Sequence, residues 1–227
     1  MFAVIFEVVP KQERWNQYLD LAKLLRPEIE RIDGFIDNER FESRRTKGRL
    51  LSLSTWRDEK AVIRWRTLAI HHQVQEKGRF EVFQDYHLRV GEFIADSGLP
   101  RGQTLPQQRF DETEVGQAKI VTISELAPAP EGSLATDDLA AELGVPGAGA
   151  QGLLDSELYE SIYTAGKLLL LGSWSGVHAA DAWKPRPPPR GELRHRQVRI
   201  VRDYGMFDRR EAPQYYPDVA RASPRPA

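Results

Sequence analysis

The segment FESRRTKGRLLSLSTW at residues 41–56 decides the fold, because it returns as YESIYTAGKLLLLGSW at residues 159–174. The two segments align without a gap at a constant offset of 118, and the alignment extends over residues 34–65 and 152–183. Identical pairs include Gly34/Gly152, Asp37/Asp155, Glu42/Glu160, Gly48/Gly166, Trp56/Trp174 and Trp65/Trp183. Two tryptophans and a hairpin glycine that fall in register indicate an internal repeat.

The first copy has the pattern of an α+β unit. Its first residues are apolar and β-branched, which is typical of a strand covered on both faces. Apolar residues then recur every three or four positions, as on one face of a helix, with Pro27 expected to kink or split that helix. The dipeptide Lys47-Gly48 is a hairpin signal. In order, we expect a strand at 2–9, a helix at 13–32, strands at 35–45 and 49–57, a helix at 59–77 and a strand at 81–94. The order βαββαβ is that of a ferredoxin-like unit.

The second copy retains the strands and shortens the helices. Its strands are expected near residues 119–126, 153–163, 167–174 and 194–204. Its first helix is reduced to about residues 134–143, before a segment rich in Gly, Ala and Pro. Prolines end its second helix early, and they are Pro185, Pro187, Pro188 and Pro189.

The chain therefore divides into a complete unit (1–95), a polar linker (96–117), a degenerate unit (118–205) and an extended C-terminal tail (206–227). One face of each amphipathic sheet must be buried, and the second copy has too little helix to cover its own. The predicted fold is α+β, with two ferredoxin-like βαββαβ units paired face to face into one intramolecular barrel.

Composition narrows the function. Lys plus Arg (32) nearly balances Asp plus Glu (33), so we expect no nucleic-acid partner and no membrane partner. Without cysteine there are no disulfides, thiolate metal sites or cysteine nucleophiles. The apolar N-terminus has no basic region before it and no cleavage site after it, so we expect a cytoplasmic protein. A small-molecule ligand is the expected partner, and a homo-oligomer could form through the outer surface.

Three further features carry a family resemblance. They are STWRDEKAVIRW at residues 54–65, the pair His71-His72, and GRFEVFQDYHLRVGEF at residues 78–93. In their order, and with the βαββαβ pattern, they resemble the antibiotic biosynthesis monooxygenase family. The resemblance implies a dimeric α/β barrel with its helices outside, and here both halves would come from one chain.

The same resemblance implies several activities. The family includes cofactor-independent monooxygenases that act on electron-rich polycyclic phenols, and also haem-degrading enzymes. The haem-degrading branch uses an Asn on the first strand, a Trp on the second helix and a His ten residues later. Trp65 matches the tryptophan, but Ile5 and Gln75 occupy the other two positions. Standard haem degradation is therefore not expected.

Two neighbouring histidines are candidates for the site. At 100° per residue, Val62, Trp65, Ala69 and His72 share one face of the second helix, and His71 points away. His72 is therefore the histidine expected to face inward, while the family resemblance is equally compatible with His71. Trp65 is expected to form a wall of the pocket, since its family counterpart lines the cavity. We expect this pocket in the first unit, between its sheet and second helix, lined by Trp65 and His72.

Three charged or titratable residues on strands complete the candidates. Glu7 is the one charged residue in an apolar strand, and it is either solvent-exposed or a buried carboxylate with a raised pKa. His87 on the last strand of the first unit is a second possible base, and Arg44 could hold an anionic group of a substrate. The predicted catalytic set is thus His72, Glu7 and His87, and the predicted substrate-binding set is Trp65, His71 and Arg44.

Three functions follow as hypotheses. The first is a monooxygenase without metal or flavin, which binds an aromatic or enolic molecule in the barrel and removes a proton with one tuned base. The second is a haem-binding or haem-degrading protein with His71 or His72 as axial ligand. The third is a non-catalytic ligand-binding or interaction scaffold, which a filled barrel interior would favour. Only the haem hypothesis involves a metal, and the other two predict no metal site.

Overall fold

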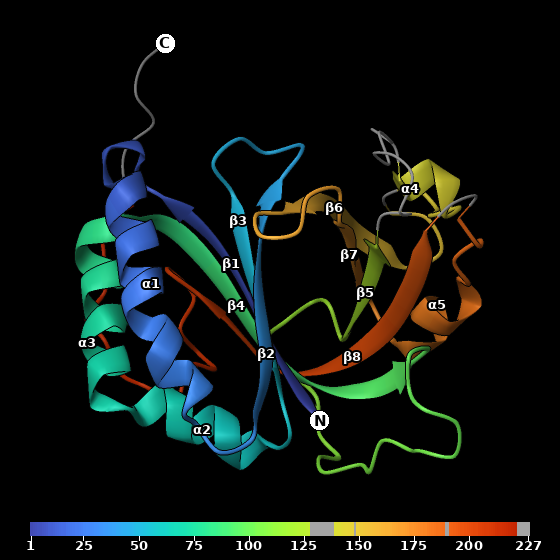
Figure 1. The fold of residues 1–227 in the computed structure, drawn as a ribbon, viewed down its shortest axis with the longest axis horizontal. Helices are drawn as coiled ribbons and strands as arrows, with labels where there is room; N and C mark the ends of the chain where they lie inside the picture. The colour runs from blue at the N-terminus through green and yellow to red at the C-terminus, as the bar shows by residue number, and fades with distance from the viewer. Residues whose placement is uncertain (128–138, 148, 189–190, 222–227) are drawn as a thin grey trace.

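The computed structural model describes residues 1–127, 139–147, 149–188 and 191–221. The first half contains a four-stranded sheet and three main helices (Figure 1). Its elements are β1 (Phe2–Pro10), the 3₁₀ turn η1 (Gln12–Arg14), α1 (Trp15–Glu30), β2 (Phe35–Ser43), β3 (Leu50–Trp56), α2 (Glu59–Thr67), α3 (Ala69–Lys77), the π-helical turn η2 (Gly78–Val82) and β4 (Phe83–Asp96). Pro27 lies inside α1 without splitting it.

The second half repeats the strands with little helix. Its elements are β5 (Ile120–Ala127), α4 (Leu139–Glu142), β6 (Leu153–Ser161), β7 (Leu168–Trp174), α5 (Val177–Ala182) and β8 (Glu192–Gly205). The first part of the helix expected at 134–143, residues 134–138, lies outside the described residues, as does Pro189. Where it is described, α5 has only six residues and ends before the proline cluster.

The eight strands close into one barrel in the order β1-β3-β2-β6-β7-β5-β8-β4. Within each half, hydrogen bonds join the strands in the ferredoxin-like order, and the halves meet edge to edge where β2 pairs with β6 and β4 pairs with β8. The β4–β8 seam is long, from His87↔Gly205 to Asp96↔Arg196. The predicted fold class, an α+β chain that builds a dimeric-type α/β barrel by itself, is confirmed.

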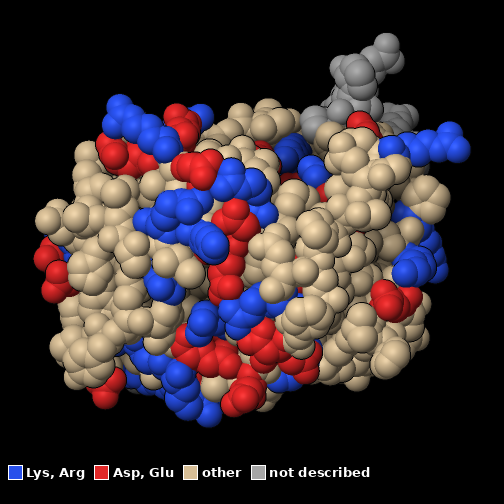
Figure 2. All heavy atoms as spheres, turned by 90° about the horizontal axis from the view of Figure 1, so that it is seen from below, with Lys and Arg blue, Asp and Glu red and all other residues tan. Residues whose placement is uncertain are grey.

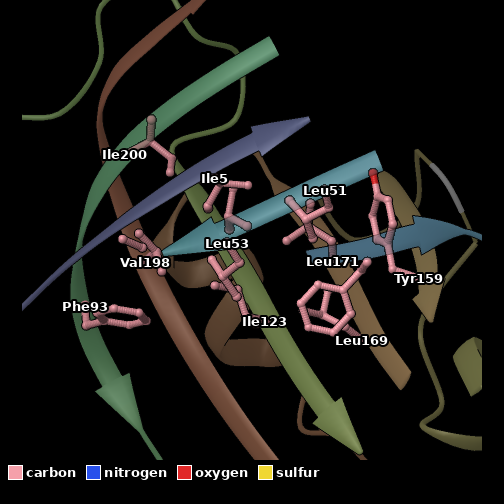
Figure 3. Packing of buried hydrophobic residues seen from close by; sticks show 13 residues of the cluster. Ile5, Leu51, Leu53, Phe93, Ile123, Tyr159, Leu169, Leu171, Val198 and Ile200 are labelled. Carbon is pink, nitrogen blue, oxygen red and sulfur yellow. The ribbon is translucent and has the colours of Figure 1, made fainter. Parts of the chain in front are cut away.

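The interior of the barrel is filled by side chains from both halves (Figure 3). Alternation along each strand sends every second residue inward, and at these positions the chain carries large apolar groups. They include Ile5, Leu51, Leu53, Phe93, Ile123, Tyr159, Leu169, Leu171, Val198 and Ile200. Apolar side chains therefore pack the middle of the barrel, and binding of a small molecule in the barrel stays a prediction.

Buried ionic groups lie in the barrel at corresponding positions of the two copies. The Glu7 carboxylate accepts hydrogen bonds from Arg89 and from the Tyr159 hydroxyl, both at 2.6 Å. At the matching position of the second copy, the Glu125 carboxylate pairs with Arg196 at 2.8 Å. The repeat thus preserves a carboxylate–guanidinium pair in each half, beside the apolar core.

The helices cover the two halves unequally. α1, α2 and α3 form a full layer over the outer face of the first sheet, whereas the second sheet is covered by α4 and α5, which pack with Trp174 and Trp183 (Figure 1). No helix among the described residues is both long enough and apolar enough to cross a lipid bilayer. On the face seen in Figure 2, basic and acidic side chains intermix, in keeping with the nearly zero net charge.

The single helix expected at 59–77 is in fact two helices. Leu68 has an extended backbone conformation, with ψ of 128°, between the nine-residue helices α2 and α3. Just before it, the Thr67 hydroxyl donates to the Ile63 carbonyl oxygen at 2.9 Å. Such back-bonding by threonine competes with the regular helix ladder and bends helices. The break rotates every residue after it relative to a continuous helix.

Candidate functional site

A cavity of about 210 Å³ lies outside the barrel, between the outer face of the first sheet and its helix layer. Its floor is built from two cross-strand rows, because successive outward-facing residues on neighbouring strands lie side by side. One row runs Arg202, Val90, Val4, Ser54 and Asn38, and the other runs Tyr204, Leu88, Phe6, Ser52 and Arg40. The centre of the floor is apolar and its two sides are polar.

The helices supply a mostly apolar roof. From α1 come Leu21, Ala22, Leu25 and Ile29, from α2 Val62, Ile63 and Trp65, and from α3 His71 and Val74. Two of the floor residues, Arg202 and Tyr204, belong to β8 of the second half, and residues of the C-terminal tail close one end. The site was expected within the first unit, between its sheet and second helix, and the second half adds to it a flank of the floor and the tail.

His71 is the histidine that faces this cavity. Its ring stacks on Trp65, with centroids 3.9 Å apart and planes 16° from parallel. Nδ1 lies 2.9 Å from the Trp65 carbonyl oxygen, which can only accept, so Nδ1 carries the proton. Nε2 keeps its lone pair and lies 3.4 Å from the side-chain amide nitrogen of Gln75. Burial lowers the pKa of His71 to about 4, against a smaller opposing effect of that hydrogen bond. His71 is therefore neutral at pH 7.

His72 lies outside the cavity, and the prediction that it faces inward is wrong. It is exposed, and its ring packs against Tyr216 of the tail, with Nδ1 3.1 Å from the tyrosine hydroxyl. An inward-facing His72 would require an unbroken helix from residue 59. Because the backbone is extended at Leu68, the phase changes there and His71 takes the inward position.

Glu7 faces the barrel interior rather than solvent or the cavity. Burial opposes ionisation of its carboxyl, but Arg89 and the Tyr159 hydroxyl outweigh it, and the pKa of Glu7 lies below its ordinary value. The alternatives considered for this residue, solvent exposure or a raised pKa, are both wrong. A carboxylate held by a guanidinium is a poor base, and its surroundings make it a structural ion pair.

The two remaining predicted residues also lie away from the cavity. His87 points to the opposite side of β4 from Tyr86, with Nε2 2.6 Å from an Asp203 carboxylate oxygen. Arg44 follows the end of β2, and its guanidinium lies 4.0 Å from Glu160. Of the six predicted site residues, the structure brings together only Trp65 and His71.

Six arginines and one glutamate line the cavity, so its lining is strongly basic. The glutamate, Glu59, already pairs with Arg109 at 2.8 Å, and Arg26 pairs with Glu30 at 3.0 Å. Among the residues that the structure describes, no carboxylate lies within ion-pair distance of the others, which are Arg40, Arg66, Arg79, Arg202 and Arg209. The cavity therefore presents several guanidinium groups without a counter-ion of their own.

Most of these polar residues were not foreseen from the sequence. Tyr86 was not among the predicted site residues, although it directly precedes His87 on β4 and therefore points to the opposite side of the strand. Arg209 and Gln214 lie in a tail that was expected to wrap the surface as extended chain. No local pattern marks a tail residue as part of a site formed by distant strands. The described residues contain no cluster of three or more His, Asp or Glu arranged for a metal ion.

Comparisons with known proteins agree with the architecture. The family model for antibiotic biosynthesis monooxygenase matches residues 1–77. A protein of Pyricularia oryzae (strain 70-15) named jasmonate monooxygenase ABM is 41% identical over 230 residues, which span 97% of this chain and 100% of that protein. An aldoxime dehydratase, solved in complex with butyraldoxime, superposes with a TM-score of 0.59 at 12% identity, over 88% of this chain and 79% of that chain. At 12% sequence identity, this structural similarity supports a shared fold only.

Proposed function

Because this chain belongs to the antibiotic biosynthesis monooxygenase family, we propose that it is a monooxygenase whose substrate is a small, largely apolar and enolisable molecule bound in the helix–sheet cavity. The relative's name points to jasmonate as the first compound to test, and jasmonate combines a cyclic ketone with a carboxylate. The cavity volume of about 210 Å³ lies below the roughly 300–1,000 Å³ of pockets for drug-sized ligands. A compact substrate fits this size.

The observation that carries the proposal is the neutral His71 in an apolar cavity. Its Nε2 can accept a proton, while Nδ1–H is held by the Trp65 carbonyl oxygen and fixes both tautomer and ring orientation. With a pKa of about 4, His71 removes a proton only from a group whose anion is stabilised by the surroundings. The unneutralised arginines of the lining supply that stabilisation.

The reaction can run with the substrate as its own reductant. His71 takes a proton from a methylene group next to a carbonyl, and the carbanion forms a carbon–oxygen bond to O₂. The peroxide takes up that proton. The second C–H bond then breaks as the O–O bond does, which leaves a new carbonyl and releases water. One oxygen atom stays in the product and one leaves, so no flavin, metal or external reductant enters the balance.

The test is oxygen consumption by the purified protein with jasmonate and with related cyclic ketones, without added reductant. We expect one O₂ consumed per product molecule, and a product that has gained one oxygen atom, derived from ¹⁸O₂, and lost two hydrogens. Turnover that depends strictly on an added reductant or cofactor would refute the cofactor-independent chemistry. Failure of every ligand to bind in the cavity would refute the site.

Haem binding is the second hypothesis, and the residues fit it only in part. His71 has the carbonyl-held Nδ1–H that suits a metal-ligating histidine, but its Nε2 lies 3.4 Å from the side-chain amide nitrogen of Gln75, which can donate to it. The volume does not fit, since a porphyrin is larger than the drug-sized ligands that already need more than this cavity holds. Titration with haem should therefore give no shifted Soret band. The scaffold hypothesis expected a filled barrel, but the cavity outside it gives the fold a place for a ligand.

A further inference from the structure

We infer that the substrate of this site is an anion, and that its carboxylate binds to Arg79, Arg209 and Tyr86 at the end of the cavity closed by the C-terminal tail. The inference rests on the proposed function, since it concerns the same cavity. It adds the substrate's charge, the group recognised and the residues that recognise it.

The three side chains converge on one point. The Tyr86 hydroxyl accepts a hydrogen bond from Arg209 at 2.6 Å and a longer one from Arg79 at 3.4 Å. All three residues line the cavity. Tyr86 lies on β4, Arg79 on η2 and Arg209 in the tail, so three separate elements place donors at this end. Such convergence fits a built subsite better than chance proximity on a surface.

The cluster has hydrogen-bond donors without partners and lacks a hydrogen-bond acceptor. Arg79 is only 2% exposed, yet its Nε has no partner, and the buried Nε of Arg209 has none either within the described part of the chain. Both oxygen lone pairs of Tyr86 are engaged, and no described residue accepts its hydroxyl proton. Buried donors of this kind are costly when left unpaired. An acceptor that occupies the cavity would take the Tyr86 hydroxyl proton and lie beside both guanidinium groups, since all three residues line the cavity.

A carboxylate is the acceptor that best matches the cluster. Two guanidinium groups of formal charge +1 each have no carboxylate partner among the described residues. A planar carboxylate can take parallel hydrogen bonds from a guanidinium fork. A phosphate needs more donors and carries more charge, while the adjoining floor of Phe6, Leu88 and Val90 is apolar. The complementary ligand is therefore an apolar body with one carboxylate at one end.

The tail positions its half of the anchor. The Arg209 guanidinium lies between the rings of Tyr204 and Tyr216, 5.5 and 5.3 Å from their centroids, and donates to the Gln214 carbonyl oxygen at 2.8 Å. Arg79 in turn donates to tail carbonyl oxygens, those of Met206 at 2.7 Å and Pro217 at 2.9 Å. The tail thus carries one arginine of the site and is held in place by the other.

The test compares the affinity of an acid with that of its uncharged ester for the full-length protein. Calorimetry measures both affinities without any turnover. The probes are jasmonate with methyl jasmonate, and octanoate with methyl octanoate. We expect each acid to bind about 10- to 100-fold more tightly than its ester, which is the range for charge-assisted hydrogen bonds. Arg209→Gln should lower acid affinity much more than ester affinity and so remove most of this preference, and Tyr86→Phe should reduce the preference. Arg210→Gln is the matched control, because Arg210 is exposed, pairs with Asp208 and does not line the cavity.

The outcomes separate this inference from the proposed function. If acids bind more tightly through Arg209 but no oxygen is consumed, the anchor stands and the monooxygenase proposal fails. Equal binding of acid and ester would overturn the anchor even in an active enzyme, as would an acid preference that survives Arg209→Gln. An equal loss of affinity in Arg209→Gln and Arg210→Gln would also overturn it, since it would reveal a general effect of tail charge.

Discussion

Replacing His71 and His72 separately tests which histidine serves the reaction. The two residues are adjacent in α3 but differ in every contact. His71 stacks on Trp65 in the cavity, whereas His72 is exposed and touches Tyr216 of the tail. We predict that His71→Ala abolishes most activity and that His72→Ala leaves it nearly unchanged.

The magnitudes follow from these contacts. A positioned general base typically contributes about 10²- to 10⁴-fold in rate, so His71→Ala should lower kcat by that factor. The Trp65 carbonyl oxygen loses its donor, which costs about 1–3 kcal/mol, and the lost stacking adds about 0.5–1.5 kcal/mol. At roughly 2–4 °C per kcal/mol for a chain of this size, Tm should fall by about 3–18 °C. His72→Ala should change stability by only about 0.5 kcal/mol, as is usual for a surface residue.

The assay is oxygen consumption well below the Tm of each variant, with thermal unfolding measured in parallel. Added imidazole can occupy the space that the His71 ring leaves, and it should restore part of the activity of His71→Ala. A merely structural role would show no such rescue. The reasoning is refuted if His72→Ala loses as much activity as His71→Ala, or if His71→Ala is destabilised but fully active per folded molecule.

Four further predictions concern stability, access and assembly. In the folded protein the pKa of His71 is about 4, below the ordinary 6.5, so the unfolded chain binds more protons between pH 4 and pH 6.5. The free energy of unfolding should therefore fall by about 1–3 kcal/mol as the pH drops from 6.5 to 4. Denaturant titrations of His71→Ala should show a smaller fall over the same pH range. Glu7→Gln should lower the free energy of unfolding by about 3–5 kcal/mol, because Arg89 is left buried without its carboxylate partner. The folded Glu7→Gln protein should keep its turnover. A selective loss of kcat would instead show that Glu7 acts as a base. Ala22→Leu should fill the cavity and weaken ligand binding while Tm stays the same or rises, and unchanged affinity would place the ligand elsewhere. Residues 1–95 expressed alone should dimerise or precipitate, because β2 and β4 lose their partner strands; a stable monomer in sedimentation experiments would contradict this.

The sequence was sufficient for the architecture because the repeat carries it. Gly48 and Gly166 mark equivalent hairpins, and both adopt positive φ, 79° and 75°. The inward apolar positions recur in both copies, so the expectation of one shared core followed from alternation alone. The break at Leu68 was not visible, since neither Gly nor Pro stands there, and a back-bonded threonine is a weak signal. That single residue reversed the assignment of His71 and His72.

The site was less predictable because most of it is non-local. Trp65 and His71 were identified from a motif, but the anchor proposed here joins η2, β4 and the tail. Glu7 illustrates the opposite error: a lone charge in an apolar strand suggested a tuned base, and its partners Arg89 and Tyr159 come from positions 82 and 152 residues away. Pairing of this kind depends on barrel closure, which no local pattern encodes.

The central claim is that the ligand binds between the first sheet and its helices rather than in the barrel. A crystal structure of the protein with jasmonate tests this most directly. We predict ligand density over Phe6 and Leu88, with the ring system near His71 Nε2 and the carboxylate toward Arg209. Density at the mouth of the barrel near His87, or against the second sheet beneath α5, would contradict the account.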